Sequence, residues 1–100
     1  MARSHMIIEQ IKLKRGIAIG LNFELQHASL LVVKADLGFV MCGYLDMATA
    51  EKLGDVAVRV SGVNNFEDVL FAEVRSVTPK AKELGITVGM KARDALELMF

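Results

Sequence analysis

A strict two-residue alternation runs through residues 17–25, IAIGLNFEL. Its large apolar residues are Ile17, Ile19, Leu21, Phe23 and Leu25. Only an extended strand brings alternate side chains to one face, so this pattern predicts a β-strand with one apolar face. The preceding segment 7–14, IIEQIKLK, also favours a strand, and Arg15-Gly16 between the two supplies a turn. The chain therefore begins with a predicted β-hairpin.

The apolar stripe of this hairpin needs a covering surface, because a two-stranded hairpin is marginally stable on its own. The hydrophobic share of the whole chain is 53%, above the roughly 45–50% apolar share of ordinary soluble domains. The mean hydropathy is likewise positive, at +0.39. A domain of this size buries only about two-thirds of its unfolded surface. We therefore expect a homo-oligomer, a dimer or a tetramer, with the stripe at 17–25 as its contact.

The rest of the chain predicts short strands and short helices. Residues 29–34 and 39–42 are apolar runs typical of strands covered on both faces, and residues 55–62 alternate as a third core strand. The predicted helices are 47–53 after an Asp46 cap, 66–72 after Asn64 or Asn65, a short one opened by Thr78-Pro79, and a last one from about Lys91. These elements predict an α+β fold in two layers. Its sheet is mixed and mostly antiparallel, with an N-terminal β-hairpin, one βαβ crossover and short helices packed on the sheet.

Length and charge bound the organisation of the chain. One hundred residues make one domain. Residues 1–5 look like an expression-tag remnant, which leaves 6–100 as the domain, with 6–27 as the hairpin and oligomerisation region and 28–100 as the core. Without the tag, 11 basic residues stand against 12 acidic ones. This balance gives no strong attraction to nucleic acid or to an anionic membrane, and no apolar run approaches the roughly 20 residues that span a bilayer. A single cysteine forms no internal disulfide, which fits a cytoplasmic protein.

The spacing between Cys42 and Val56 nominates a site. About a dozen residues with one helix is the minimum for a right-handed parallel crossover, and ligands bind outside the carboxyl ends of parallel strands. Two predicted helix N-termini face the same edge, which would suit a small anionic ligand. The candidate binding residues at this rim are Cys42, Gly43, Tyr44, Asp46, Ser61, Gly62, Asn64 and Asn65.

Cys42 is the only cysteine, and it has three interpretations. A free cysteine most often packs in the core. A thiol just ahead of a helix N-terminus can instead be reactive, which makes Cys42 the one candidate catalytic residue. A cysteine–histidine pair would need His27, which the sequence places on another strand, at a tight connection. Gly43 and Gly62 either relieve crowding at strand ends or let a ligand approach closely.

Several chemistries are excluded. One cysteine and one histidine outside the tag cannot build a zinc site within the chain. The sequence holds no P-loop, no G-x-G-x-x-G after a strand, no G-x-S-x-G and no H-E-x-x-H. The acidic residues sit at turns, caps and first helical turns, which disfavours a carboxylate-pair enzyme. We expect no metal and no cofactor.

Four segments carry a resemblance to a known family. They are GFVMCGYLD at 38–46, RVSGVNNFEDVL at 59–70, TPKAKELGITVGM at 78–90 and RDALELM at 93–99. With these motifs the chain resembles the YunC-like family of small bacterial and archaeal proteins, a domain of unknown function. The resemblance implies one α+β domain whose N-terminal β region mediates tetramer formation. It implies no activity, and its Met41-Cys42-Gly43 motif falls on the nominated rim.

The sequence thus favours an oligomeric domain that binds a small ligand or a partner at the rim near Cys42. The two alternatives are a cysteine-dependent enzyme that uses Cys42 and a purely structural homo-oligomer. Whether the chain is an enzyme stays open.

Overall fold

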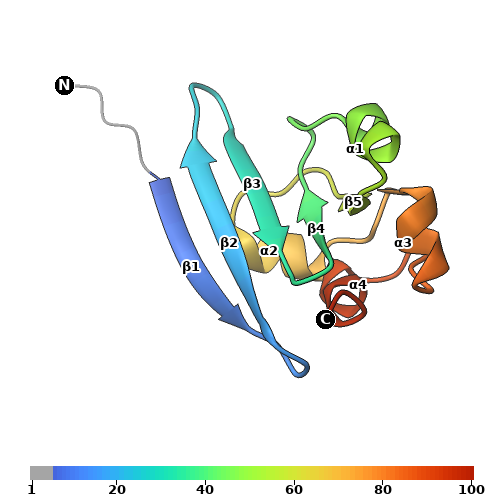
Figure 1. Cartoon of the computed structure of the whole chain (residues 1–100). Coiled ribbons are helices and arrows are strands. Elements are labelled where there is room, and N and C mark those ends of the chain that lie inside the picture. Colours follow the sequence, from blue (N-terminus) through green and yellow to red (C-terminus); the bar gives the residue numbers. More distant parts are fainter. Residues whose placement is uncertain (1–5) are drawn as a thin grey trace.

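The structure, a computed structural model, describes residues 6–100, and the predicted tag remnant at 1–5 lies outside them. One sheet of six strands organises the chain, and its strand order follows the sequence from β1 to β6 (Figure 1). The strands are β1 (Met6–Lys12), β2 (Ile17–Glu24), β3 (Ser29–Lys34), β4 (Gly38–Met41), β5 (Val56–Arg59) and β6 (Ser76–Val77). The helices are α1 (Met47–Leu53), α2 (Phe66–Phe71), α3 (Pro79–Glu83) and α4 (Ala92–Glu97). None of the helices in this described range is long and apolar enough to cross a membrane.

One pair of strands in this sheet is parallel. β4 and β5 run side by side in the same direction, joined through α1, while every other neighbouring pair is antiparallel. The predicted α+β class, with its N-terminal hairpin and βαβ crossover, is confirmed. The parallel pair brings the carboxyl ends of β4 and β5 to one edge of the sheet.

The helix boundaries follow local capping chemistry. Asp46 accepts from the Ala48 N–H and opens α1, Asn65 accepts from the Asp68 N–H and opens α2, and Thr78 accepts from the Ala81 N–H before Pro79 opens α3. Each such cap satisfies a backbone donor that a helix start otherwise leaves unpaired.

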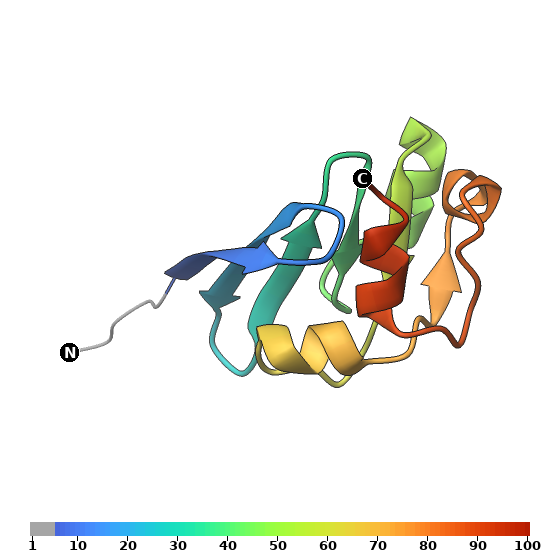
Figure 2. The same cartoon turned by 90° about the horizontal axis from the view of Figure 1, so that it is seen from below.

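The sheet carries helices on both faces at β4 and β5, but on one face only at β1 to β3. On the main core face, α2, α3 and α4 pack against strand residues such as Leu31, Val40 and Val58, all fully buried. On the other face, α1 covers Met41 and Ala57 through Ala50. Figure 2 shows α2 and α1 on opposite sides of the sheet.

The strand β2 presents its small side chains to the core and its large ones to the outside. Ala18 is fully buried under the helices, while Ile19 beside it is 52% exposed. The reason is Phe66 of α2, whose ring lies so close to Gly20 that a Cβ there would stand 2.6 Å from Cε1. The strand prediction is confirmed, and its apolar stripe faces away from the helices of its own chain.

We call this surface the open face. The strand register places its side chains together across β1, β2 and β3. Its apolar members are Met6, Ile8, Ile17, Ile19, Leu21, Phe23, Leu30 and Val32. Leu25, the last residue of the predicted stripe, lies beyond the end of β2 and is 41% exposed.

Contacts with the C-terminal helix α4 and the residues after it hold the β1–β2 hairpin against the core. The Glu97 carboxylate accepts the backbone N–H groups of Lys14 and Arg15, both at 2.9 Å, and the Phe100 ring covers Gly16. Desolvation alone would raise the pKa of Glu97, but the two N–H bonds and the charges of Lys14 and Arg93 outweigh it, and the pKa lies below its usual value.

Candidate functional site

Three loops meet at the edge where β4 and β5 end. The loop after β4 starts at Cys42 and the loop after β5 starts at Val60, whose N–H donates to the Met41 carbonyl at 2.9 Å. Because β3 runs antiparallel to β4, the turn that precedes β3 reaches the same edge. This arrangement creates two hollows on the rim.

The first, which we call the Cys42 hollow, has a volume of about 410 Å³. It is lined by Ala28, Cys42, Gly43, Tyr44, Gly62, Val63 and Asn64. None of these side chains carries a charge. The structure therefore brings five of the eight nominated rim residues around one uncharged hollow.

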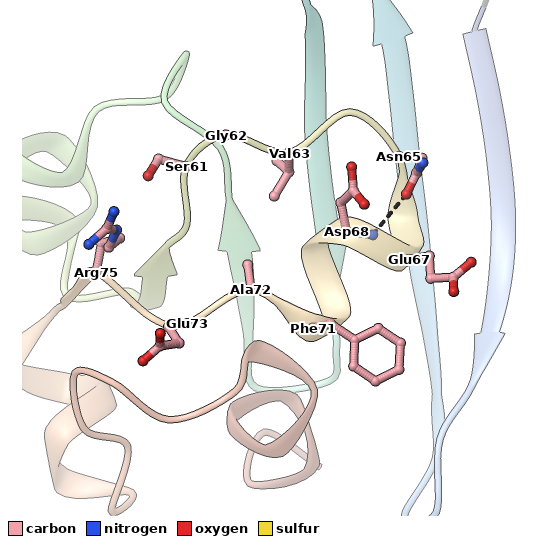
Figure 3. Close-up of a pocket in the computed structure, with 10 residues that line it drawn as sticks. All are labelled: Ser61, Gly62, Val63, Asn65, Glu67, Asp68, Phe71, Ala72, Glu73 and Arg75. Carbon is pink, nitrogen blue, oxygen red and sulfur yellow. Dashed lines mark hydrogen bonds between the residues drawn. The ribbon is translucent and has the colours of Figure 1, made fainter.

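The second, the Arg75 hollow, has a volume of about 700 Å³ and lies on the other side of the β5–α2 loop (Figure 3). It is lined by Ser61, Gly62, Val63, Asn65, Glu67, Asp68, Phe71, Ala72, Glu73 and Arg75. The nominated residues Ser61 and Asn65 face this side, and Asn65 is engaged there as the cap of α2, with its amide oxygen 2.8 Å from the Asp68 nitrogen. Three acidic side chains and one arginine line it, so the lining of this hollow is polar and charged.

Asp46 is apart from both hollows. Its carboxylate accepts the Thr49 hydroxyl at 2.8 Å and the Ala48 N–H at 3.0 Å. The hydroxyl bond and, next, the N–H bond hold the pKa of Asp46 below its usual value. The side chain is thus an ionised helix cap, with its oxygens already occupied.

Cys42 is 4% exposed and part of the main core. Its Sγ accepts the buried Leu31 N–H at 3.3 Å and lies 4.0 Å from the Ser29 carbonyl oxygen, towards which the thiol donates. In a regular antiparallel pair a carbonyl of β4 would accept that N–H, but the Cys42 carbonyl instead accepts from Leu45 in the turn. The sulfur replaces the missing acceptor, and this lets the chain leave the sheet at Cys42.

The backbone conformation accounts for one of the two glycines of the Cys42 hollow but not for the other. Gly62 has a positive φ of 70°, a conformation that favours glycine. Gly43 has no positive φ, and a Cβ added there would meet nothing within 4 Å. Nothing in the described chain requires glycine at position 43.

The sequence did not nominate Ala28 or Val63, which complete the Cys42 hollow. The antiparallel pairing of β3 with β4 explains the position of Ala28, since it places the start of one strand beside the end of the other. The same loop carries His27, which is exposed and lines a small neighbouring hollow of about 270 Å³ with Asn64. Within residues 6–100, no three His, Cys, Asp or Glu side chains are grouped as metal ligands would be.

Comparisons with known proteins define the class of protein to which this chain belongs. The sequence profile of the family described as "Domain of unknown function (DUF1805)" matches residues 41–99, and the chain belongs to this family. It is 44% identical over 77 residues to "Uncharacterized protein YunC" of Bacillus subtilis (strain 168), a match that covers 73% of this chain and 76% of that one.

A solved structure shares the whole fold. The crystal structure of a protein of unknown function from Thermoplasma acidophilum superposes with a TM-score of 0.95 at 34% sequence identity, covering 100% of this chain and 98% of the other. The YunC-like resemblance in the sequence is therefore confirmed.

Proposed function

We propose that the protein is a homo-oligomeric binding domain whose small-molecule site is the Cys42 hollow. The observation that supports binding is the meeting of two glycine-containing loops, from the parallel strands β4 and β5, around one hollow. This is where sheets with parallel strands place their ligands. The volume of about 410 Å³ lies within the range of known small-molecule sites, about 300–1,000 Å³.

The open face supports assembly. It exposes a continuous set of large apolar side chains, among them Ile8 at 65%, Ile17 at 52% and Ile19 at 52%. A contiguous apolar patch of this kind is unusual on a monomer and typical of an interface. A second copy is the partner we propose, because closed symmetric assemblies of identical chains are the commonest oligomers. Light scattering at micromolar concentration should give the mass of a dimer or tetramer; a monomer mass would refute this part of the proposal.

A cysteine-dependent enzyme is the weaker alternative. The Cys42 thiol is buried and bonded to the backbone of β3 on both its donor and acceptor sides, whereas reactive cysteines are partly exposed in an electropositive setting. A lone thiol without a disulfide partner in the chain also suits a reducing compartment such as the cytoplasm, which we retain as the proposed location.

A thermal-shift screen tests the binding role. A panel of small metabolites, neutral and anionic, is added to the protein over a range of concentrations. A true ligand raises the melting temperature in a concentration-dependent way. The same compound should lose this effect on Gly43→Val, which adds a side chain to the lining of the hollow at a position where a Cβ meets no other atom within 4 Å. Ala48→Val, on exposed α1, is the control and should keep the shift. A compound that stabilises both variants equally would place binding elsewhere, and a panel with no hit would favour the purely structural oligomer.

A further inference from the structure

We infer that the Cys42 hollow takes a small uncharged ligand with an apolar body and a hydrogen-bond-accepting oxygen, and that it selects against anions. This inference rests on the proposed binding function and names the class of ligand. It replaces the small anionic ligand that the predicted helix N-termini suggested.

The lining of the hollow favours an uncharged ligand with an apolar body. Ala28, Cys42, Val63 and the Tyr44 ring supply apolar surface, and no cationic side chain lines the hollow. An anion bound there would lose water without gaining an opposite charge, which costs far more than burying a neutral group.

A carboxylate beside the hollow strengthens this selection against anions. The Asn64 N–H donates to the Asp68 carboxylate at 3.0 Å, so that a negative charge stands beside one wall of the hollow. The caps are a further reason, because the Asp46 and Asn65 side chains already accept the first-turn N–H groups of α1 and α2. Neither helix therefore offers those donors to an anion.

The backbone supplies hydrogen-bond donors for the acceptor oxygen of the ligand. Within residues 6–100, the N–H groups of Gly43, Tyr44, Gly62 and Val63 have no hydrogen-bond acceptor. These four donors come from the two loops that enclose the hollow. A carbonyl oxygen on a neutral ligand satisfies such donors without bringing a charge into the site.

The glycine at position 43 also supports a ligand in the hollow. Neither φ nor crowding explains a glycine there, whereas a ligand that approaches the backbone closely does explain it.

A matched pair of probes tests the inference. Benzamide and benzoate share the ring and the acceptor oxygen and differ in charge. Each is titrated into the ¹⁵N-labelled full-length protein, and the amide signals of Gly43, Tyr44, Gly62 and Val63 are followed. We expect benzamide to shift these signals with a several-fold lower dissociation constant than benzoate.

Two variants sharpen the result. Asn64→Lys puts a cation at the wall of the hollow and should move the preference towards benzoate, while Asn64→Gln should leave the preference for benzamide unchanged. If benzoate binds the wild type more tightly at the same amides, the ligand class is wrong and the binding site stands. If neither probe shifts these amides, the proposed binding function fails and the inference fails with it.

Discussion

The two ends of the sheet are covered in different ways. β4 and β5 have helices on both faces, with α1 on one and α2, α3 and α4 on the other. β1 to β3 have helices on one face only, and their other face carries large apolar side chains into solvent. The difference shows where this chain completes its own core and where it leaves a surface for another molecule.

Strand β2 makes the contrast sharpest. Its inward residues Ala18 and Gly20 are small because Phe66 of α2 fills the space above Gly20, and its outward residues Ile17 and Ile19 are large and half exposed. A strand that ended at a monomer surface would have the opposite arrangement, with polar residues outside. We take this reversal as the physical basis of the proposed assembly.

Ala18→Asp should have the largest effect. Ala18 is fully buried, and an unpaired carboxylate there costs about 3–5 kcal/mol, a large part of a small domain's whole stability of about 5–15 kcal/mol. We expect a urea unfolding midpoint far below that of the wild type. A urea midpoint equal to that of the wild type would contradict the assigned core face.

Ile19→Asp tests the opposite face of the same strand. Ile19 is 52% exposed, so a carboxylate there stays solvated in the monomer but loses its water in an assembly. We expect a folded chain with the light-scattering mass of a monomer and a melting temperature that no longer depends on protein concentration.

The control for this substitution is Val88→Asp, which places the same charge on an apolar residue that is 60% exposed outside the open face. It should leave the mass of the assembly unchanged. An Ile19→Asp protein that keeps the wild-type mass would refute the open face as the interface.

Cys42→Ala should have an intermediate effect, at the doubly covered end of the sheet. The change leaves the buried Leu31 N–H without its acceptor, and an unsatisfied buried donor costs about 1–3 kcal/mol. Cys42→Ser keeps an acceptor and a donor and should lose less. Urea unfolding with a shared m-value measures both; an alanine variant more stable than the serine variant would show that the sulfur acts through packing alone.

The smallest expected effect is the loss of stability when acid protonates Glu97, which holds the β1–β2 turn. The pKa of Glu97 is lower in the folded state than the usual glutamate value of about 4.3. Its stabilising contribution is therefore complete above about pH 4.3 and is lost as the pH falls through the folded-state pKa. Glu97→Gln should flatten this part of the curve of melting temperature against pH.

Glu83→Gln is the matched control, because the Glu83 side chain is 65% exposed and pairs with Lys80 only at 3.7 Å. Exposed pairs of this kind contribute little to stability. The inference about Glu97 fails if the two variants give the same acid profile.

Much of the fold followed from local patterns. The alternation in 17–25 predicted β2, and the caps Asp46, Asn64 or Asn65, and Thr78-Pro79 predicted three helix starts, because period and capping depend on neighbouring residues alone. The spacing from Cys42 to Val56 also predicted the parallel pair, since few connections of that length are possible. The rim was located by the same spacing, and the loops of β4 and β5 do meet there.

The details of the rim depended on contacts between distant segments. Ala28 joins the Cys42 hollow through the β3–β4 pairing, and Asp46, nominated with the others, points its carboxylate back onto α1. Sequence spacing places a residue at an edge, but it does not say which way the side chain turns.

By itself, the sequence determined the order of most strands and helices and three of the helix starts, and it showed that one strand carries a continuous apolar stripe. Only the tertiary structure decided that this stripe faces outward, because the packing of Phe66 against Gly20 selects the small side of β2 for the core. It also decided that the Cys42 sulfur accepts a backbone N–H from β3. Both outcomes depend on contacts with residues distant in the sequence, and a local sequence pattern does not specify those contacts.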